Sequence, residues 1–213
     1  MGTSAAQLSP RSPQWDLVRR SYVDPSVPPP VTVARIVSAL DQGFVQGLSE
    51  RPVAQALESL LSLAGEIKAA AESPPRLTAV ARELRTRVKQ AVVAGKTASR
   101  FGELALSAAS KTALAGHGER VARRFLACYV AEVFSYLVSR DIGRYVGQGR
   151  FQGLSDVPLY VRAVETYVQQ TLDEADLADP APDAALADLQ GYLRDAVAAC
   201  LDLLSAEGEA SAD

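Results

Sequence analysis

The stretch over residues 119–146 constrains the fold of this chain most, because it is apolar on almost every side. Within 125–138 only Glu132 and Ser135 are clearly polar. A helix that is hydrophobic nearly all round is stable only where other elements cover it. The sequence therefore predicts a central helix enclosed by further helices.

Apolar residues recur at helical spacing in the segments on both sides of this stretch, and Pro-rich or Gly-rich breaks separate these segments. Segments in which apolar and polar residues alternate, as they do in a β-strand, are nearly absent. We therefore predict an all-α fold, a bundle of five or six helices preceded by a short N-terminal amphipathic segment and a Pro-rich linker. The expected helices cover residues 31–48, 49–72, 76–115, 119–146, 155–172 and 186–204.

The domain organisation follows from these breaks. A chain of 213 residues that is 48% hydrophobic can bury a substantial core. We expect residues 1–30 to form a flexible N-terminal segment and Pro-rich linker, 31–205 a single α-helical bundle domain, and 206–213 an acidic disordered tail. The amphipathic segment near the N-terminus either docks in a partner's groove or folds back on its own chain. Its candidate docking residues are Trp15, Leu17, Val18 and Tyr22.

Charge is strongly sorted along the sequence. Residues 74–150 contain 14 Lys or Arg and 5 Asp or Glu, whereas residues 151–213 contain 2 and 13. Residues 1–73 contain 6 and 7, so the overall charge of −3 conceals a basic middle and an acidic end. This sorting favours an anionic partner, or attraction between two parts of the chain.

The basic residues of the middle segment share one side of the expected helix over 76–115. If that helix is unbroken, they form a ridge about 40 Å long, at about 1.5 Å per residue. The ridge is a solvated or internally paired face, a site for a partner protein, or a track for a nucleic-acid backbone. Its residues are Arg82, Arg85, Lys89, Lys96, Arg100 and Lys111.

The loop over 143–156 is the best candidate for a small anion site. It combines four glycines with Arg144 and Arg150, and a helix N-terminus follows it. The glycine spacing does not fit a dinucleotide-binding turn. The alternative is an ordinary turn.

Residues that usually perform catalysis are scarce. His117 is the sole histidine, and the cysteines Cys128 and Cys200 lie far apart in sequence, so we expect no metal, no cofactor and no disulfide framework. One constellation remains in the central helix, where polar residues recur every four positions. An enzyme could use it if its side chains met in one pocket with Arg140 or Arg144; the alternative is a structural contact. The constellation is Arg124, Cys128, Glu132, Tyr136 and Arg140.

The sequence therefore favours a non-catalytic α-helical interaction or adaptor protein, a subunit of a larger assembly, with a protein partner or self-association. The alternative is a nucleic-acid-binding helical subunit that uses the basic ridge and the loop containing Arg144 and Arg150. The many arginines and alanines suggest a bacterial source. The N-terminal sequence lacks the apolar region of a signal peptide and no apolar run is long enough for a bilayer, so we expect a cytoplasmic protein without a membrane partner.

Overall fold

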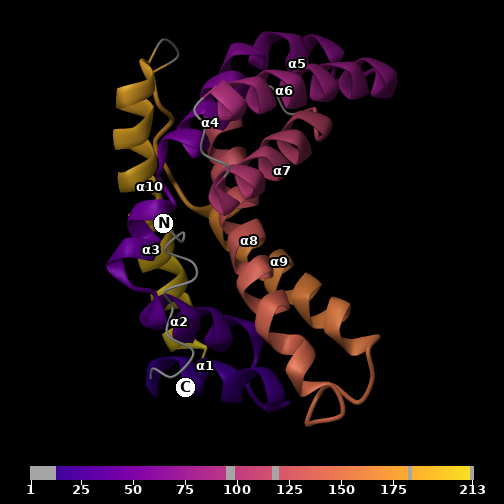
Figure 1. Ribbon diagram of the computed structural model, residues 1–213, viewed down its shortest axis with the longest axis vertical. Coiled ribbons are helices and arrows are strands. Elements are labelled where there is room, and N and C mark those ends of the chain that lie inside the picture. The colour runs from indigo at the N-terminus through magenta and orange to yellow at the C-terminus, as the bar shows by residue number, and fades with distance from the viewer. Residues whose placement is uncertain (1–12, 95–98, 117–119, 182–183, 212–213) are drawn as a thin grey trace. The chain divides into compact units, whose positions relative to one another are not determined.

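The computed structural model describes residues 13–94, 99–116, 120–181 and 184–211. These residues are all-α, as predicted, with one isolated β-bridge between Gln148 and Phe151 in a loop. The helices, labelled α1 to α10 in Figure 1, outnumber the expected five or six. The difference arises because several expected helices are interrupted, for example at Leu40 and Leu63.

The contacts divide the chain into two compact units, whereas the sequence suggested one domain over 31–205. Unit 1 comprises Met1–Val45, Val130–Glu174 and Ala198–Asp213, and unit 2 comprises Gln46–Tyr129 and Ala175–Val197. Helices α3 (Gln42–Gly47), α8 (Val121–Ile142) and α10 (Leu186–Ala210) each contribute to both units. The apolar character of α8 agrees with its burial, since most of its side chains lie in the core.

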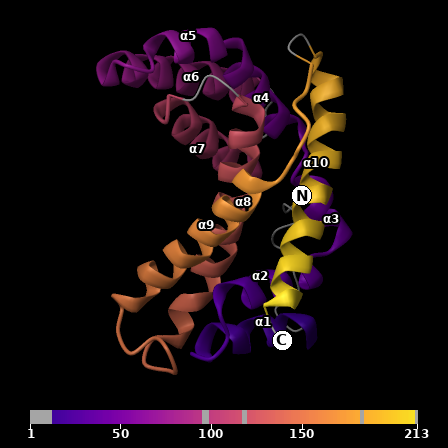
Figure 2. The same ribbon diagram turned by 180° about the vertical axis from the view of Figure 1, so that it is seen from behind.

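Unit 1 contains α1 (Pro13–Val23), α2 (Pro29–Ala39), the second part of α8, the short 3-10 helix η2 (Gly143–Tyr145), α9 (Asp156–Glu174) and the end of α10. The proline run at 28–30 begins α2, because proline fixes the backbone angle that a first helical turn requires. Helix α2 packs on α1 and on α9, and Thr32 and Tyr160 share a hydrogen bond of 2.8 Å between α2 and α9. Figure 2 shows α9 running beside α8.

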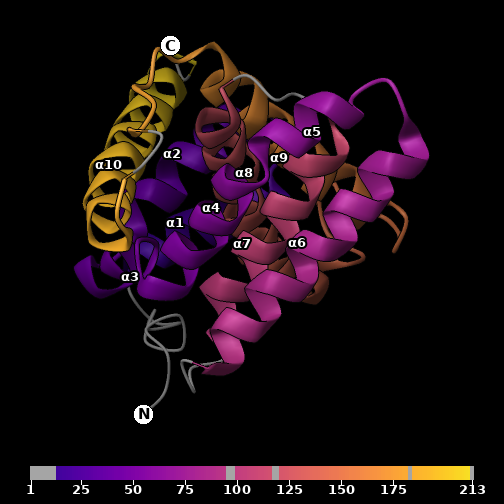
Figure 3. The same ribbon diagram turned by 90° about the horizontal axis from the view of Figure 1, so that it is seen from above.

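Unit 2 contains α4 (Arg51–Ser62), α5 (Ala64–Ala70), α6 (Pro74–Ala94), α7 (Arg100–Leu114) and the first parts of α8 and α10. Helices α4, α6 and α7 pack against one another, and α5 packs on α6 (Figure 3). Their buried leucines and valines follow the helical stripes that the sequence predicts. The core includes Val53, Leu57, Leu60, Leu84, Val88 and Phe101.

The expected helix over 76–115 is two helices. Ser99 adopts an extended backbone, with φ −109° and ψ 145°, and its hydroxyl accepts a hydrogen bond of 3.0 Å from the backbone N–H of Gly102. This arrangement is an N-cap, which starts a new helix. The condition for a continuous ridge, one unbroken helix over 76–115, is therefore not met.

Helix α10 continues to Ala210, beyond the end of the bundle that was expected at residue 205. Gly208 is buried, and its Cα lies so close to Pro30 and Ala34 of α2 that a Cβ would approach the Pro30 carbonyl oxygen to 2.6 Å. The described part of the expected acidic tail is therefore helical and packed, apart from the turn at Ser211.

Candidate interaction surface

The basic residues of α6 lie together on its exposed side. Arg82, Arg85 and Lys89 are spaced by three and four residues and are all exposed, while Leu84 and Val88 on the opposite side are buried. This spacing gives one positive face on a helix whose other face belongs to the core of unit 2.

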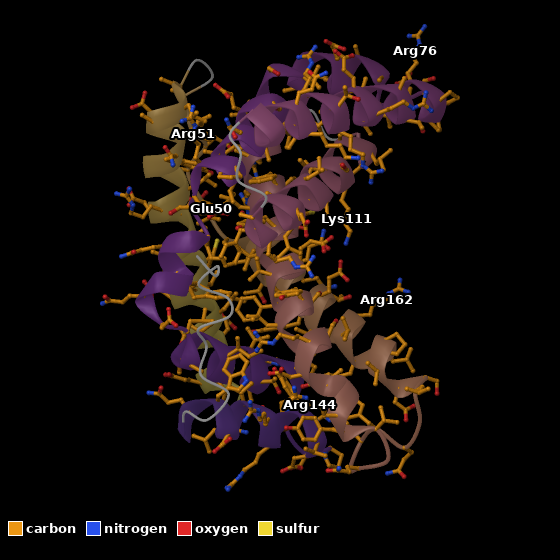
Figure 4. The ribbon with its side chains drawn as sticks, viewed as in Figure 1. Glu50, Arg51, Arg76, Lys111, Arg144 and Arg162 are labelled. Atoms are coloured by element: carbon orange, nitrogen blue, oxygen red, sulfur yellow. The ribbon has the colours of Figure 1, made fainter. Side chains whose placement is uncertain are left out.

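The other predicted ridge residues belong to α7 or lie outside the described residues. Arg100 and Lys111 are exposed on α7, and Lys111 points away from the helix in Figure 4. Lys96 lies outside the part of the chain that the structure describes. The positive residues thus occupy two packed helices and do not extend along one axis.

A hollow of about 210 Å³ lies between α6 and α7, and we call it the basic groove. Arg82 and Arg85 line it from α6, and Leu114, which is 50% exposed, lines it from α7. Thr78, Ala81 and Ser110 complete the lining. The groove therefore combines two guanidinium groups with an exposed apolar side chain.

Ion pairs neutralise only part of this basic region. Arg87 pairs with Glu83, and Arg100 pairs with Glu103 at 2.7 Å, each within one helix. Arg82, Arg85 and Lys89 form no ion pair with any residue in the described ranges. Within the described residues, no carboxylate therefore neutralises their charge in an ion pair.

The predicted docking segment folds back on its own chain as helix α1. Trp15, Val18 and Tyr22 are at most 1% exposed, whereas Leu17 is 53% exposed. The Trp15 indole Nε1–H donates a hydrogen bond of 2.8 Å to Asp141 of α8. In unit 1, three of the four candidate docking residues therefore form core, and Leu17 alone among them remains at the surface.

Asp141 is the polar centre of this contact. Arg140 donates to both its carboxylate oxygens at 3.1 Å, and the Arg140 guanidinium carbon lies 5.5 Å from the Trp15 ring centre. Burial disfavours the charged carboxylate, but the hydrogen bonds from Arg140 and Trp15 outweigh it and hold the pKa of Asp141 below its ordinary value. This cluster fastens α1 to α8.

The glycine loop also has an internal role. The Arg150 guanidinium donates to the carbonyl oxygens of Asp24 and Val27 and lies 4.5 Å from the Tyr160 ring centre. Gly149 has φ +51°, and a Cβ there would lie 2.8 Å from the carbonyl carbon of Val23. The loop holds the connection between α1 and α2, where the Arg150 guanidinium donates to two backbone carbonyl oxygens.

Arg144, the other basic residue of the loop, is exposed in η2 (Figure 4). The five residues of the α8 constellation differ in burial: Cys128 is buried, whereas the other four are partly exposed, namely Arg124, Glu132, Tyr136 and Arg140. Arg140 is directed to Asp141. No cluster of metal-ligating side chains exists among the described residues, and His117 lies outside them.

Glu50 is a site that the sequence analysis missed. It occupies the N-cap position of α4 beside the exposed Arg51 (Figure 4). Within the described residues, its buried Oε1 has no hydrogen-bond partner, and burial raises its pKa to about 7. The buried Tyr129 hydroxyl donates to the Leu48 carbonyl oxygen at 3.1 Å. Nothing in the local sequence distinguishes Glu50 from an ordinary glutamate that precedes a helix.

Glu50 makes stability depend on pH. The folded protein binds this proton more tightly than the unfolded chain, so stability should fall as the pH rises from about 4.5 to about 7 and stay level above that range. Glu50→Gln should therefore raise the free energy of unfolding at pH 8 by about 1 kcal/mol, a figure reduced for the exposed half of the side chain. At pH 4 the gain should vanish.

Urea unfolding at pH 4, 6 and 8 measures this difference. Glu58→Gln on the exposed side of α4 is the control, because its carboxylate is in solvent. A gain for Glu50→Gln that is equal at all three pH values would contradict the expectation.

Comparisons with protein-family models, curated proteins and solved structures found no match to this chain. In the described residues, no helix combines the length and apolar character needed to cross a membrane.

Proposed function

We propose that this protein is a non-catalytic α-helical interaction protein, a subunit or adaptor of a larger assembly, and that the basic groove binds an acidic segment of a partner protein. The observation that carries the proposal is the groove itself. Arg82 and Arg85 line it without an ion pair in the described part of the chain, and Leu114 is exposed beside them. A carboxylate can bind a guanidinium at two points, and an apolar side chain of the partner can cover Leu114.

A nucleic-acid partner is the alternative, and the geometry favours it less. A phosphate backbone is best followed by a long continuous row of cations, whereas the positive residues here are divided between α6 and α7. The exposed Leu114 offers nothing to a phosphate. Arg150, the second half of the proposed loop site, already binds carbonyl oxygens of its own chain.

The first measurement is size-exclusion chromatography with light scattering at low and high salt, read at 260 and 280 nm. A peak that carries excess 260 nm absorbance and loses it in high salt would establish the alternative. A peak without nucleic acid leads to a binding assay by fluorescence anisotropy, with a labelled peptide of glutamates and leucines and a labelled single-stranded oligonucleotide as probes.

Reversing the charges of the two groove arginines and of Lys89, which lies beside them on the same face of α6, should weaken peptide binding. The triple variant Arg82→Glu, Arg85→Glu, Lys89→Glu is expected to weaken affinity at least about tenfold, because repulsion replaces attraction at three positions. The control triple variant Arg51→Glu, Arg162→Glu, Arg194→Glu changes the net charge equally at exposed positions elsewhere. Equal losses for the two variants would show attraction by overall charge and would contradict a groove site.

Leu114→Ser separates the two classes of partner. It should weaken binding of the peptide and leave binding of the oligonucleotide unchanged, since only a protein partner has apolar side chains to place against Leu114. Oligonucleotide binding that the groove variant abolishes, together with no peptide binding, would replace the proposal with the alternative.

A further inference from the structure

Unit 1 has a second hollow, of about 300 Å³, on a surface formed by α1, α2 and the end of α10. Leu17 of α1, Val31 and Ala34 of α2, and Gly208 of α10 contribute its apolar lining. Gly208 matters for its shape, because the missing side chain lets α10 lie directly on α2. We call this surface the α1–α2–α10 face.

Leu17 is an apolar side chain of this face that the core of unit 1 does not cover. Trp15, Val18 and Tyr22 of the same helix point into the core, yet Leu17 is 53% exposed at the edge of the hollow. A single exposed leucine is ordinary on a protein surface. Here, however, the exposed leucine lies beside an apolar hollow. The same face therefore offers both an apolar side chain and a space into which an apolar side chain of another molecule fits.

The charges on the face have opposite signs. Arg35 of α2 and Glu209 of α10 both line the hollow, and neither forms an ion pair with another residue in the ranges that the structure covers. An acidic partner would meet Glu209, and a basic partner would meet Arg35. A partner that satisfies both must carry one charge of each sign, arranged around an apolar centre.

A second copy of the same face has that arrangement. In a two-fold interface both subunits use the same surface. If residue i of the first copy contacts residue j of the second, then residue j of the first copy contacts residue i of the second. Arg35 of each copy could then pair with Glu209 of the other, while the Leu17 side chains enter the facing hollows. We propose that the α1–α2–α10 face is a two-fold interface through which the protein forms a dimer. The site is separate from the basic groove and does not depend on the proposed function.

Removing the apolar contact should produce a monomer. Light scattering over a dilution series should show the wild-type mass fall from dimer to monomer, and Leu17→Glu should raise the dissociation constant at least about tenfold. Leu159→Glu is the control, because Leu159 is an exposed leucine of α9 in the same unit, 68% exposed. A wild-type protein that is monomeric at every concentration, or equal effects of the two variants, would overturn the proposal.

Exchange of charges tests the pairing directly. Arg35→Glu should dissociate the dimer, because the introduced carboxylate would face Glu209 of the other copy. Glu209→Arg should dissociate it as well, because two arginines would then meet. An equal mixture of the two single variants should recover a dimer that contains one chain of each kind. In this mixed dimer, the native Arg35 of one chain pairs with the native Glu209 of the other. The second contact pairs the glutamate introduced at position 35 with the arginine introduced at position 209. Native mass spectrometry distinguishes the mixed species from either homodimer.

The mixing experiment excludes a contact within one chain. A contact between Arg35 and Glu209 of the same molecule would remain broken in both variants, and their mixture would stay monomeric. That result, with circular dichroism showing both variants folded, would also overturn the proposal. If the two charge variants fail to fold, the dilution series with Leu17→Glu decides, because that substitution changes an exposed side chain.

Discussion

Trp15→Ala should lower the free energy of unfolding by about 3–5 kcal/mol. Trp15 is 1% exposed, so its removal leaves a cavity between α1 and α8. It also removes the N–H that donates to the buried Asp141, and the ring against which Arg140 lies. A buried carboxylate that loses a donor adds its own cost to that of the cavity.

Two further variants divide this effect into its parts. Trp15→Phe keeps an aromatic ring in the core but cannot donate to Asp141, so we expect a loss of about 1–3 kcal/mol. Leu17→Ala on the same helix alters a half-exposed side chain and should change stability by no more than about 0.5 kcal/mol in dilute, monomeric protein. Urea unfolding followed by circular dichroism measures all three. Equal midpoints for Trp15→Ala and Leu17→Ala would show that α1 contributes little to the folded state.

The only tryptophan of the chain gives a second readout. Because Trp15 is buried, its emission should shift to longer wavelength when α1 leaves α8. If that shift coincides with the loss of helix signal, α1 unfolds with its unit. An earlier shift would mean that α1 detaches first, as the sequence expectation of a flexible 1–30 segment implies.

The pattern of side chains predicted local structure well and long-range partners poorly. The spacing of Arg82, Arg85 and Lys89 places them on one exposed face of α6, and the apolar residues of α8 place it in the core. These features depend only on helical periodicity. Periodicity carries no information about Asp141, which is 126 residues from the tryptophan that it binds.

The differences between the sequence-based expectations and the structure have physical causes that residue types do not reveal. Arg150 suggested an anion site, but its guanidinium donates to the backbone carbonyls of Asp24 and Val27, and such a partner leaves no mark in the sequence because every residue has a carbonyl. The basic ridge required one continuous helix, and the N-cap at Ser99 divides it. Glu50 is unusual only because of its burial, which depends on how α4 and its neighbours pack.

Gly208 and Gly191 form a matched pair in α10, and the same substitution should have opposite effects at the two positions. A Cβ at Gly208 would overlap the Cβ of Ala34 and lie 2.6 Å from the Pro30 carbonyl oxygen. Gly208→Ala should therefore force α10 away from α2 and lower the free energy of unfolding by about 1–3 kcal/mol. A Cβ at Gly191 would meet no atom within 4 Å.

Gly191→Ala should consequently raise the free energy of unfolding by about 0.5–1 kcal/mol, because alanine loses less conformational freedom than glycine when a helix forms. Thermal and urea unfolding of the two variants measure the difference. Since helix propensity alone would stabilise both, a loss at Gly208 isolates the close approach of α10 to α2. A gain at both positions would mean that the end of α10 is not held against α2, and the hollow that depends on this approach would have a different shape.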